Sequence, residues 1–200
     1  MKKIVTVAAL LASISAPAFA QVVTDPAKVE AGTYRIEPDH TRVRFDVSHF
    51  GFTKYDGEFR GVAGTLNLDP SNPDASKVDI TIQTGSVQVP NAKLKGELDG
   101  PAWLDAAKYP EITFKSTKVV TTGADTADVT GDFTLHGVTK PLTLKVKFNA
   151  AGINPANKHY TSGFEATGSI KRTEFGVKTF APMIGDAVDL DIDAAFEKQK

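Results

Sequence analysis

Residues 42–48 read Arg-Val-Arg-Phe-Asp-Val-Ser, an unbroken alternation of polar and apolar side chains. Successive side chains of a β-strand point to opposite faces, so this period of two predicts a strand with one apolar and one charged face. The same alternation returns at residues 77–83, 141–149 and 188–197. Less regular strands are expected at residues 33–36, 57–68, 111–120, 127–135 and 160–171. These patterns predict an all-β protein.

Residues 91–108 interrupt the strands with a helical pattern. Asp99 can cap a helix that has Pro101 in its first turn and that stops before Pro110, and residues 91–98 can also form a helix. We therefore expect a short helical insertion around residues 91–108.

About eight antiparallel strands with one helical insertion favour a single closed barrel, because closure removes the exposed strand edges. A barrel of this size either fills itself with side chains or holds one small ligand, so its apolar faces must point inward. Periodicity alone favours the filled core, which leaves the hollow barrel as the alternative.

The aromatic residues argue against a barrel that spans the outer membrane. Such barrels carry girdles of Tyr and Trp at both interfaces, whereas this chain has 4 Tyr and 1 Trp against 12 Phe. Its final strand ends in Glu-Lys-Gln-Lys at residues 197–200 instead of an aromatic cap. We expect charged faces in water and no stable membrane insertion.

The first 20 residues have the three parts of a cleaved signal peptide. Lys2 and Lys3 precede an apolar stretch at residues 4–14, and Ala-Phe-Ala at residues 18–20 forms a cleavage site. The stretch is shorter than the roughly 20 residues of a membrane-spanning helix. We expect export to the periplasm by the Sec route, with residues 21–200 forming one domain.

Composition narrows the function classes. The chain has no Cys, which excludes disulfides, thiolate zinc sites and iron–sulfur clusters. It carries 23 Lys and Arg against 24 Asp and Glu, and loss of Lys2 and Lys3 leaves 21 against 24, a net charge of −3. Because no basic run occurs, nucleic acid is not an expected partner.

Neither a metal site nor a known catalytic motif is expected. His40 and His49 fall on opposite faces of a regular strand, which makes them a poor metal pair. The sequence contains no G-x-S-x-G, Walker, dinucleotide-binding or H-E-x-x-H motif. Glu97, Asp99 and Asp105 could supply an acid or a base, but acidic residues on a short exposed helix are usually solvated.

Four blocks of sequence resemble the YceI-like family. They are Glu-Pro-Asp-His-Thr-Arg-Val-Arg-Phe-Asp-Val-Ser-His-Phe-Gly at 37–51, Tyr-Pro-Glu-Ile-Thr-Phe-Lys-Ser-Thr at 109–117, Val-Thr-Gly-Asp-Phe-Thr-Leu-His-Gly-Val-Thr-Lys-Pro-Leu at 129–142 and Gly-Phe-Glu-Ala-Thr-Gly-Ser-Ile-Lys-Arg-Thr-Glu-Phe-Gly at 163–176. The blocks follow one another in order across nearly all of residues 21–200. The chain departs from the family at Glu97, where a His is usual, which bears on the head group that the protein prefers.

The resemblance implies a lipocalin-like, eight-stranded barrel that binds a polyisoprenoid chain, such as an isoprenoid quinone or a polyprenyl phosphate. It also implies a periplasmic and often homodimeric protein that needs no catalytic cofactor. In the matched blocks and on the apolar strand faces, the expected pocket residues are Val43, Phe45, Val47, Ile80, Ile82, Phe114, Phe133, Leu135, Leu142, Leu144, Val146, Phe148, Phe164 and Ile170. Expected head-group contacts at the barrel mouth are His40, Lys171 and Arg172, since phosphate suits Arg or Lys.

Three functions remain open at this point. A carrier of long-chain lipid is favoured, because the resemblance reverses the preference for a filled core. An enzyme acting on an isoprenoid or a quinone is the second. The third is a stress-response protein whose cavity is incidental.

Overall fold

The computed structural model of the protein describes residues 22–200. The predicted signal peptide, residues 1–20, lies outside these residues. The described part of the chain contains eleven strands and one α-helix, α1 (Ala92–Asp99). The strands are β1 (Gly32–Ile36), β2 (Arg42–His49), β3 (Thr53–Phe59), β4 (Val62–Leu68), β5 (Lys77–Gln83), β6 (Val87–Gln88), β7 (Glu111–Thr121), β8 (Thr126–Leu135), β9 (Val138–Ile153), β10 (Tyr160–Lys171) and β11 (Ile184–Lys198).

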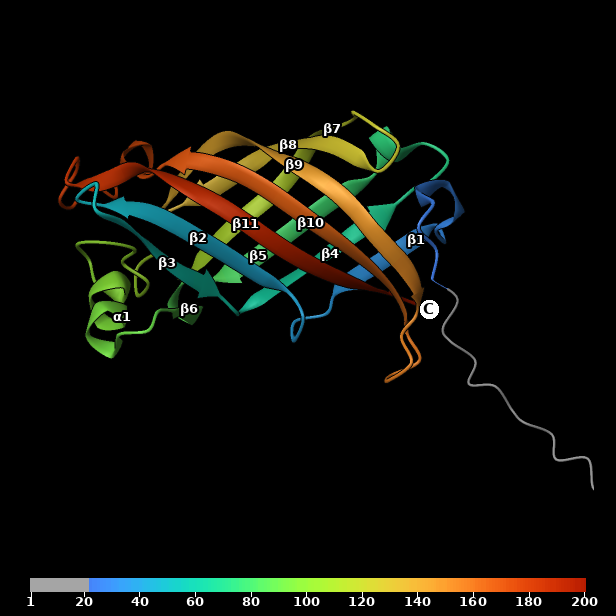
Figure 1. Ribbon diagram of the computed structural model, residues 1–200, viewed down its shortest axis with the longest axis horizontal. Helices are drawn as coiled ribbons and strands as arrows, with labels where there is room; N and C mark the ends of the chain where they lie inside the picture. Colours follow the sequence, from blue (N-terminus) through green and yellow to red (C-terminus); the bar gives the residue numbers. More distant parts are fainter. Residues whose placement is uncertain (1–21) are drawn as a thin grey trace, which may run out of the picture.

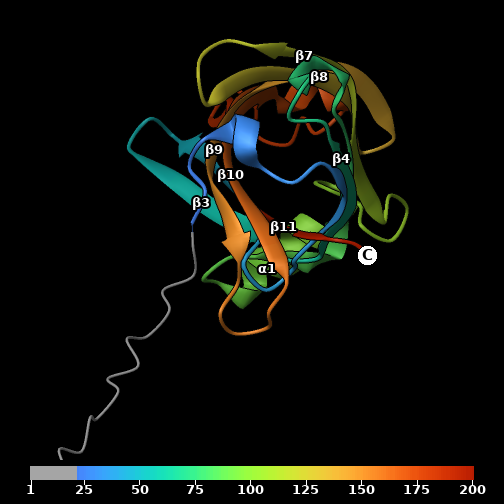
Figure 2. The same cartoon turned by 90° about the vertical axis from the view of Figure 1, so that its right-hand side faces the viewer.

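The strands form one antiparallel sheet that closes into an eight-stranded barrel (Figures 1 and 2). The ring runs β1-β4-β5-β7-β8-β9-β10-β11 and closes where β11 pairs with β1. Strands β2, β3 and β6 continue the sheet from β11, because β2 pairs with the first part of β11 and β1 with its last part. The predicted all-β closed barrel is confirmed.

One predicted strand is two strands in the structure. The sequence pattern predicts a single strand at residues 57–68, but the backbone bends between β3 and β4. The amide of Val62 donates to the carbonyl of Arg60 at 2.9 Å, a bond across three residues that makes a γ-turn. Because of this bend, β3 pairs with β2 while β4 pairs with β1.

The helical insertion is at the predicted place, but the helix occupies only its first half. The side chain of Asn91 caps α1 by accepting from the amides of Lys93 and Leu94. Asp99 ends the helix instead of capping one, since Gly100 is extended and the chain then forms hydrogen-bonded turns up to residue 109. The expected helix at residues 99–108 is therefore wrong, because the Asn91 cap places the helix one segment earlier.

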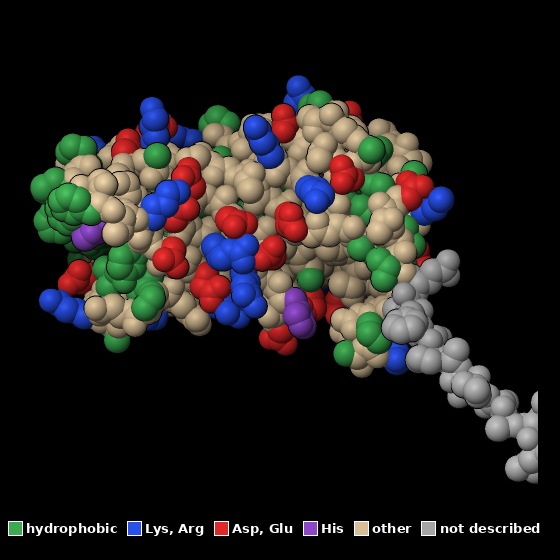
Figure 3. Space-filling model, viewed as in Figure 1, with side chains coloured by type: hydrophobic (Ala, Val, Ile, Leu, Met, Phe, Trp, Pro, Cys, Tyr) green, Lys and Arg blue, Asp and Glu red, His purple; other side chains and the backbone are tan. Residues whose placement is uncertain are grey.

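The polar face of the sheet carries ladders of opposite charges. Arg44 on β2 bridges Asp191 at 3.0 Å and Asp193 at 2.7 Å on β11, and Lys115 on β7 bridges Asp79 on β5 at 3.3 Å. Figure 3 shows acidic and basic side chains interspersed on the visible outer face of the barrel. Each exposed pair is worth only about 0–1 kcal/mol. The charges therefore contribute little to the stability of the barrel, and their main effect is to determine which face of the sheet meets water.

Tyr34 lies where the barrel closes. In strand β1, Tyr34 pairs with Leu66 of β4 on one side and with Lys198 of β11 on the other. The side chain is fully buried, and its hydroxyl donates to the carbonyl of Glu30. Burial raises the pKa of Tyr34 far above its usual range, and nearby Tyr160 and Glu30 raise it further.

We predict that this buried phenol makes the barrel sensitive to alkali. Above the usual tyrosine pKa of about 10, the unfolded chain loses a proton that folded Tyr34 keeps, so stability falls by up to about 1.4 kcal/mol per pH unit. The melting temperature of Tyr34→Phe, compared with that of the natural protein between pH 8 and pH 11, should fall less steeply. Tyr55→Phe on β3 is the control, and an equal effect of both substitutions would contradict the prediction.

Candidate ligand-binding cavity

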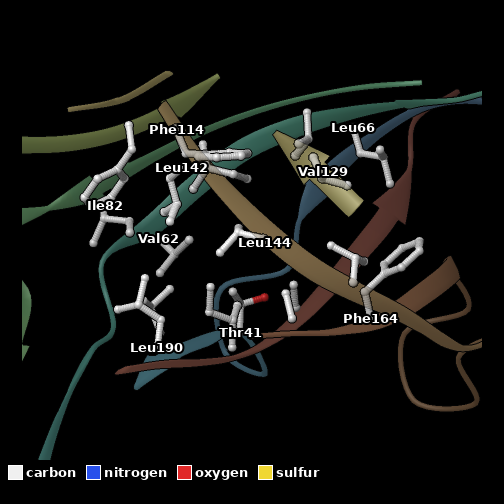
Figure 4. Close-up of a pocket in the computed structure, with 18 of the residues that line it drawn as sticks. Thr41, Val62, Leu66, Ile82, Phe114, Val129, Leu142, Leu144, Phe164 and Leu190 are labelled. Carbon is white, nitrogen blue, oxygen red and sulfur yellow. The ribbon is translucent and has the colours of Figure 1, made fainter. Parts of the chain in front are cut away.

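The barrel encloses a cavity of about 380 Å³ whose wall is almost entirely apolar. The inward faces of all the long strands contribute aliphatic and phenyl side chains, among them Val62, Leu144 and Phe164, which Figure 4 labels. The volume falls in the range of about 300–1,000 Å³ that is usual for small-molecule sites. The filled core that periodicity alone favours is wrong, because this space is not occupied by side chains.

The structure places every residue of the predicted pocket on the cavity wall. Alternation along the strands put them on one face, and closure of the sheet turns that face inward. Their contact with a ligand stays a prediction. The wall includes Val43, Phe45, Val47, Ile80, Ile82, Phe114, Phe133, Leu135, Leu142, Leu144, Val146, Phe148, Phe164 and Ile170.

Several wall residues were not among the predicted ones. Leu66 and Val62 on β4 and Ile112 and Val129 on β7 and β8 line the cavity and are buried. They belong to the less regular strands, where glycine or threonine interrupts the alternation. Counting back two residues from Phe114 would have found Ile112.

Glycines beneath two phenyl rings of the wall help to explain why large side chains do not fill the centre. A Cβ atom on Gly57 would lie 2.6 Å from the ring of Phe45, and one on Gly131 would lie 2.6 Å from the ring of Phe114. Both rings therefore occupy the space that a neighbouring side chain would take. They lie along the wall, and the middle of the barrel stays open.

The cavity extends along the barrel between two different ends. At one end, Leu98 of α1 and Trp103 and Leu104 of the turns after it form the wall. At the other end, the wall consists of the β4–β5 loop and the β7–β8 hairpin, which are exposed around residues 121–125. The Asp74 carboxylate joins these two loops by accepting from the amide and the hydroxyl of Thr121, both at 3.0 Å.

Arg172 brings a positive charge to the end that α1 covers. The residue is 4% exposed, lines the cavity, and is the only buried charged residue within 22–200. Its guanidinium donates to the carbonyls of Gly185, Val177 and Ile184, each at 2.8 Å. Burial lowers the pKa of Arg172, because it penalises the charged form. Two of its five N–H groups have no partner among the described residues.

The other two expected head-group residues lie off the wall. His40 is exposed, and its Nδ1 lies 2.6 Å from the Glu37 carboxylate. Lys171 follows Ile170 on β10, and since Ile170 points inward, Lys171 points to solvent. We expected His40, Lys171 and Arg172 to lie together at the barrel mouth. Of the three, only Arg172 lines the cavity, at the end that α1 covers.

The acidic residues that a catalytic alternative would use do not line the cavity. Glu97 lies 3.9 Å from the ammonium of Lys93, and Asp99 lies 2.6 Å from that of Lys95, so both make ion pairs along α1. In the described residues, no three His, Cys, Asp or Glu side chains are grouped to hold a metal ion. Within the same range, no helix has the length and apolar character needed to cross a bilayer.

Comparison of sequences confirms the resemblance noted above. Residues 34–196 match the model of the YceI-like domain. A UPF0312 protein from Pseudomonas savastanoi pv. phaseolicola is 37% identical over 187 residues, covering 92% of this chain and 95% of that protein. Protein YceI from Escherichia coli O157:H7 is 39% identical over 184 residues, covering 91% of this chain and 95% of that protein.

Comparison of structures supports the same fold. Burkholderia cenocepacia BcnA superposes with a TM-score of 0.73 at 22% identity, covering 80% of this chain and 98% of that one. A polyisoprenoid binding domain from Saccharophagus degradans gives a TM-score of 0.63 at 15% identity, covering 85% of this chain and all of that one (100%). At these identities the likeness concerns the fold alone.

We predict that Arg172→Lys destabilises the protein by about 2–4 kcal/mol, because an ammonium cannot reach all three carbonyls and leaves some buried and unpaired. Urea unfolding measures the change. Lys171→Ala, its exposed neighbour, should change stability by less than about 0.5 kcal/mol. If the two variants unfold at the same urea concentration, the anchoring role of Arg172 is wrong.

Proposed function

This chain belongs to the YceI-like family, and from that premise we propose that it carries one long-chain isoprenoid lipid, a quinone or a polyprenyl phosphate, inside its barrel. The observation that supports this proposal is the elongated apolar cavity between the two ends of the barrel. The structural relative from Saccharophagus degradans, described as polyisoprenoid binding, supports the same class of ligand. The predicted signal peptide at residues 1–20 favours the periplasm as the compartment.

The physical basis is the cost of exposing hydrocarbon to water. Each methylene transferred from water to the cavity gains about 0.8 kcal/mol, so a polyprenyl tail needs a dry container to cross an aqueous compartment. The wall recognises such a tail by shape and area, since it offers few hydrogen-bonding groups. Selection among tail lengths should be loose, because one added apolar unit changes affinity by only about 1–3 kcal/mol.

Arg172 gives the cavity a direction. A buried cation with two free N–H groups favours an acceptor oxygen, which either a quinone carbonyl or a phosphate supplies. We therefore place the head group at the end covered by α1 and Trp103, with the tail running towards the β7–β8 hairpin. No catalytic role follows for Arg172, because no acid or base lines the cavity beside it within the described residues.

We predict that filling the cavity removes the ligand and leaves the fold intact. Ala166 on β10 is buried on the wall, whereas Thr167 beside it is exposed on the outer face. Ala166→Phe should lower the lipid that copurifies from the periplasm roughly tenfold, while Thr167→Phe should retain it. Organic extraction and mass spectrometry measure the amount and name the lipid, and thermal unfolding confirms that both variants fold.

The same measurement separates the three candidate functions. Intact lipid bound by the natural protein and lost in Ala166→Phe supports a carrier. Conversion of an added quinone or polyprenyl phosphate during incubation would support the enzyme instead. A natural protein that neither copurifies with lipid nor takes it up would leave the cavity incidental, and the carrier proposal would fail.

A further inference from the structure

Four large apolar side chains protrude at the end of the barrel that α1 covers. Phe50, Phe52, Phe180 and Met183, here called the tip patch, are 47%, 87%, 60% and 53% exposed. Figure 3 shows a group of apolar side chains at this end, and charged side chains scattered over the middle of the visible face. Clusters of this kind commonly mark contact with a partner or a membrane.

The tip patch is one surface, although it comes from two loops. The amide of Phe50, in the β2–β3 turn, donates to the carbonyl of Met183 at 2.9 Å. The amide of Ile184 donates to the carbonyl of Phe180 at 2.8 Å, which holds the second loop in shape. The ring of Phe180 also lies 6.5 Å from that of Trp103, centre to centre.

The backbone of the tip patch is unusual for its residues. Phe50 and Phe180 both have φ of 54°, in the left-handed region that side chains with a Cβ rarely adopt. A glycine or asparagine at either place would relieve the backbone, and the exposed rings contribute little to the core. Phenylalanine at these two turns is therefore better explained by a contact outside the barrel.

The lysines at this end favour an anionic contact. Lys108, Lys171 and Lys178 form no salt bridge among residues 22–200. Asp105 attracts Lys108 and Asp186 attracts Lys171, each without a salt bridge, while Glu174 bridges Lys140 at 3.2 Å. Lys178 is the lysine nearest in sequence to Phe180. Exposed phenylalanines together with lysines that form no salt bridge match an anionic bilayer, whose interior takes the rings and whose head groups take the charges.

The tip patch is also continuous with the cavity. Trp103 contacts Phe180 on one side and lines the cavity on the other, and Ile184, next to Met183, lines the cavity as well. A membrane against the tip patch would thus lie beside the end that holds Arg172.

We propose that the protein docks on anionic lipid membranes through the tip patch and exchanges its ligand at that end of the barrel. The docking surface follows from the tip patch alone, whereas the exchange rests on the carrier function proposed above. Because the head group would lie at the docked end, the tail would enter the barrel before the head group during uptake. During release, the head group would reach the membrane before the tail.

Vesicle sedimentation tests the docking with two lipid mixtures. We expect the natural protein to bind vesicles of phosphatidylethanolamine and phosphatidylglycerol in low salt and to bind phosphatidylcholine vesicles weakly. Removing two inserted rings in Phe52→Ser/Phe180→Ser should lower binding by at least about tenfold, and Lys178→Glu should lower it several-fold. Ile153→Ser, which removes an exposed apolar side chain at the opposite end, is the matched control.

Three outcomes would overturn the docking proposal. The natural protein could fail to prefer anionic vesicles, or Ile153→Ser could weaken binding as much as the double variant does. The protein could also be a dimer that the double variant converts to a monomer without any vesicle binding, which would make the tip patch an interface between copies. Lipid extracted from the double variant separates the proposals, because docking can fail while the lipid content stays natural, and the carrier function can fail while docking persists.

Discussion

Closure of the sheet is the constraint on which the rest of the structure depends. β1 is only five residues long, yet it pairs with β4 on one edge and with β11 on the other. Without those pairings the sheet would have two open edges and its apolar face would meet water. With them, one alternation of side chains separates a dry interior from a charged exterior around the whole ring. Tyr34 is buried at this seam.

Inside the closed barrel, the polarity of the wall differs from one end of the axis to the other. Most of the wall is hydrocarbon, and its one buried charge within residues 22–200 is Arg172, held at one end by three carbonyls of the loop before β11 and its first residues. This buried charge distinguishes that end from the other, where the charged wall residues Lys77 and Asp125 are exposed. The tip patch lies outside the same end. The buried charge and the exposed apolar surface therefore lie at the same end of the barrel.

The sequence predicts the wall residues well, because side chains alternate between the inner and outer faces of each strand. β5 and β10 begin and end at the predicted residues. The alternation also places Arg172 on the inner side, two residues after Ile170. It does not predict the conformation of the loop that supplies carbonyl partners to Arg172. The bend at Arg60 is a backbone bond with no side-chain signal of its own. The helix expected at residues 91–98 forms and the one expected at 99–108 does not. Asn91 and Asp99 are equally good caps in sequence, and only the extended Gly100 decides between them.

Whether the barrel is hollow is a question that the apolar residues cannot answer, because the same phenylalanines would fill a core or line a cavity. The glycines answer it. Phe45 lies over Gly57 on the paired strand, and Phe114 lies over Gly131, so each ring spreads along the wall where a side chain on the neighbour would have pushed it inward. A large residue next to a glycine across the strands covers area without filling volume. Pairs of this kind, read together with the alternation, favour a hollow barrel over a solid one.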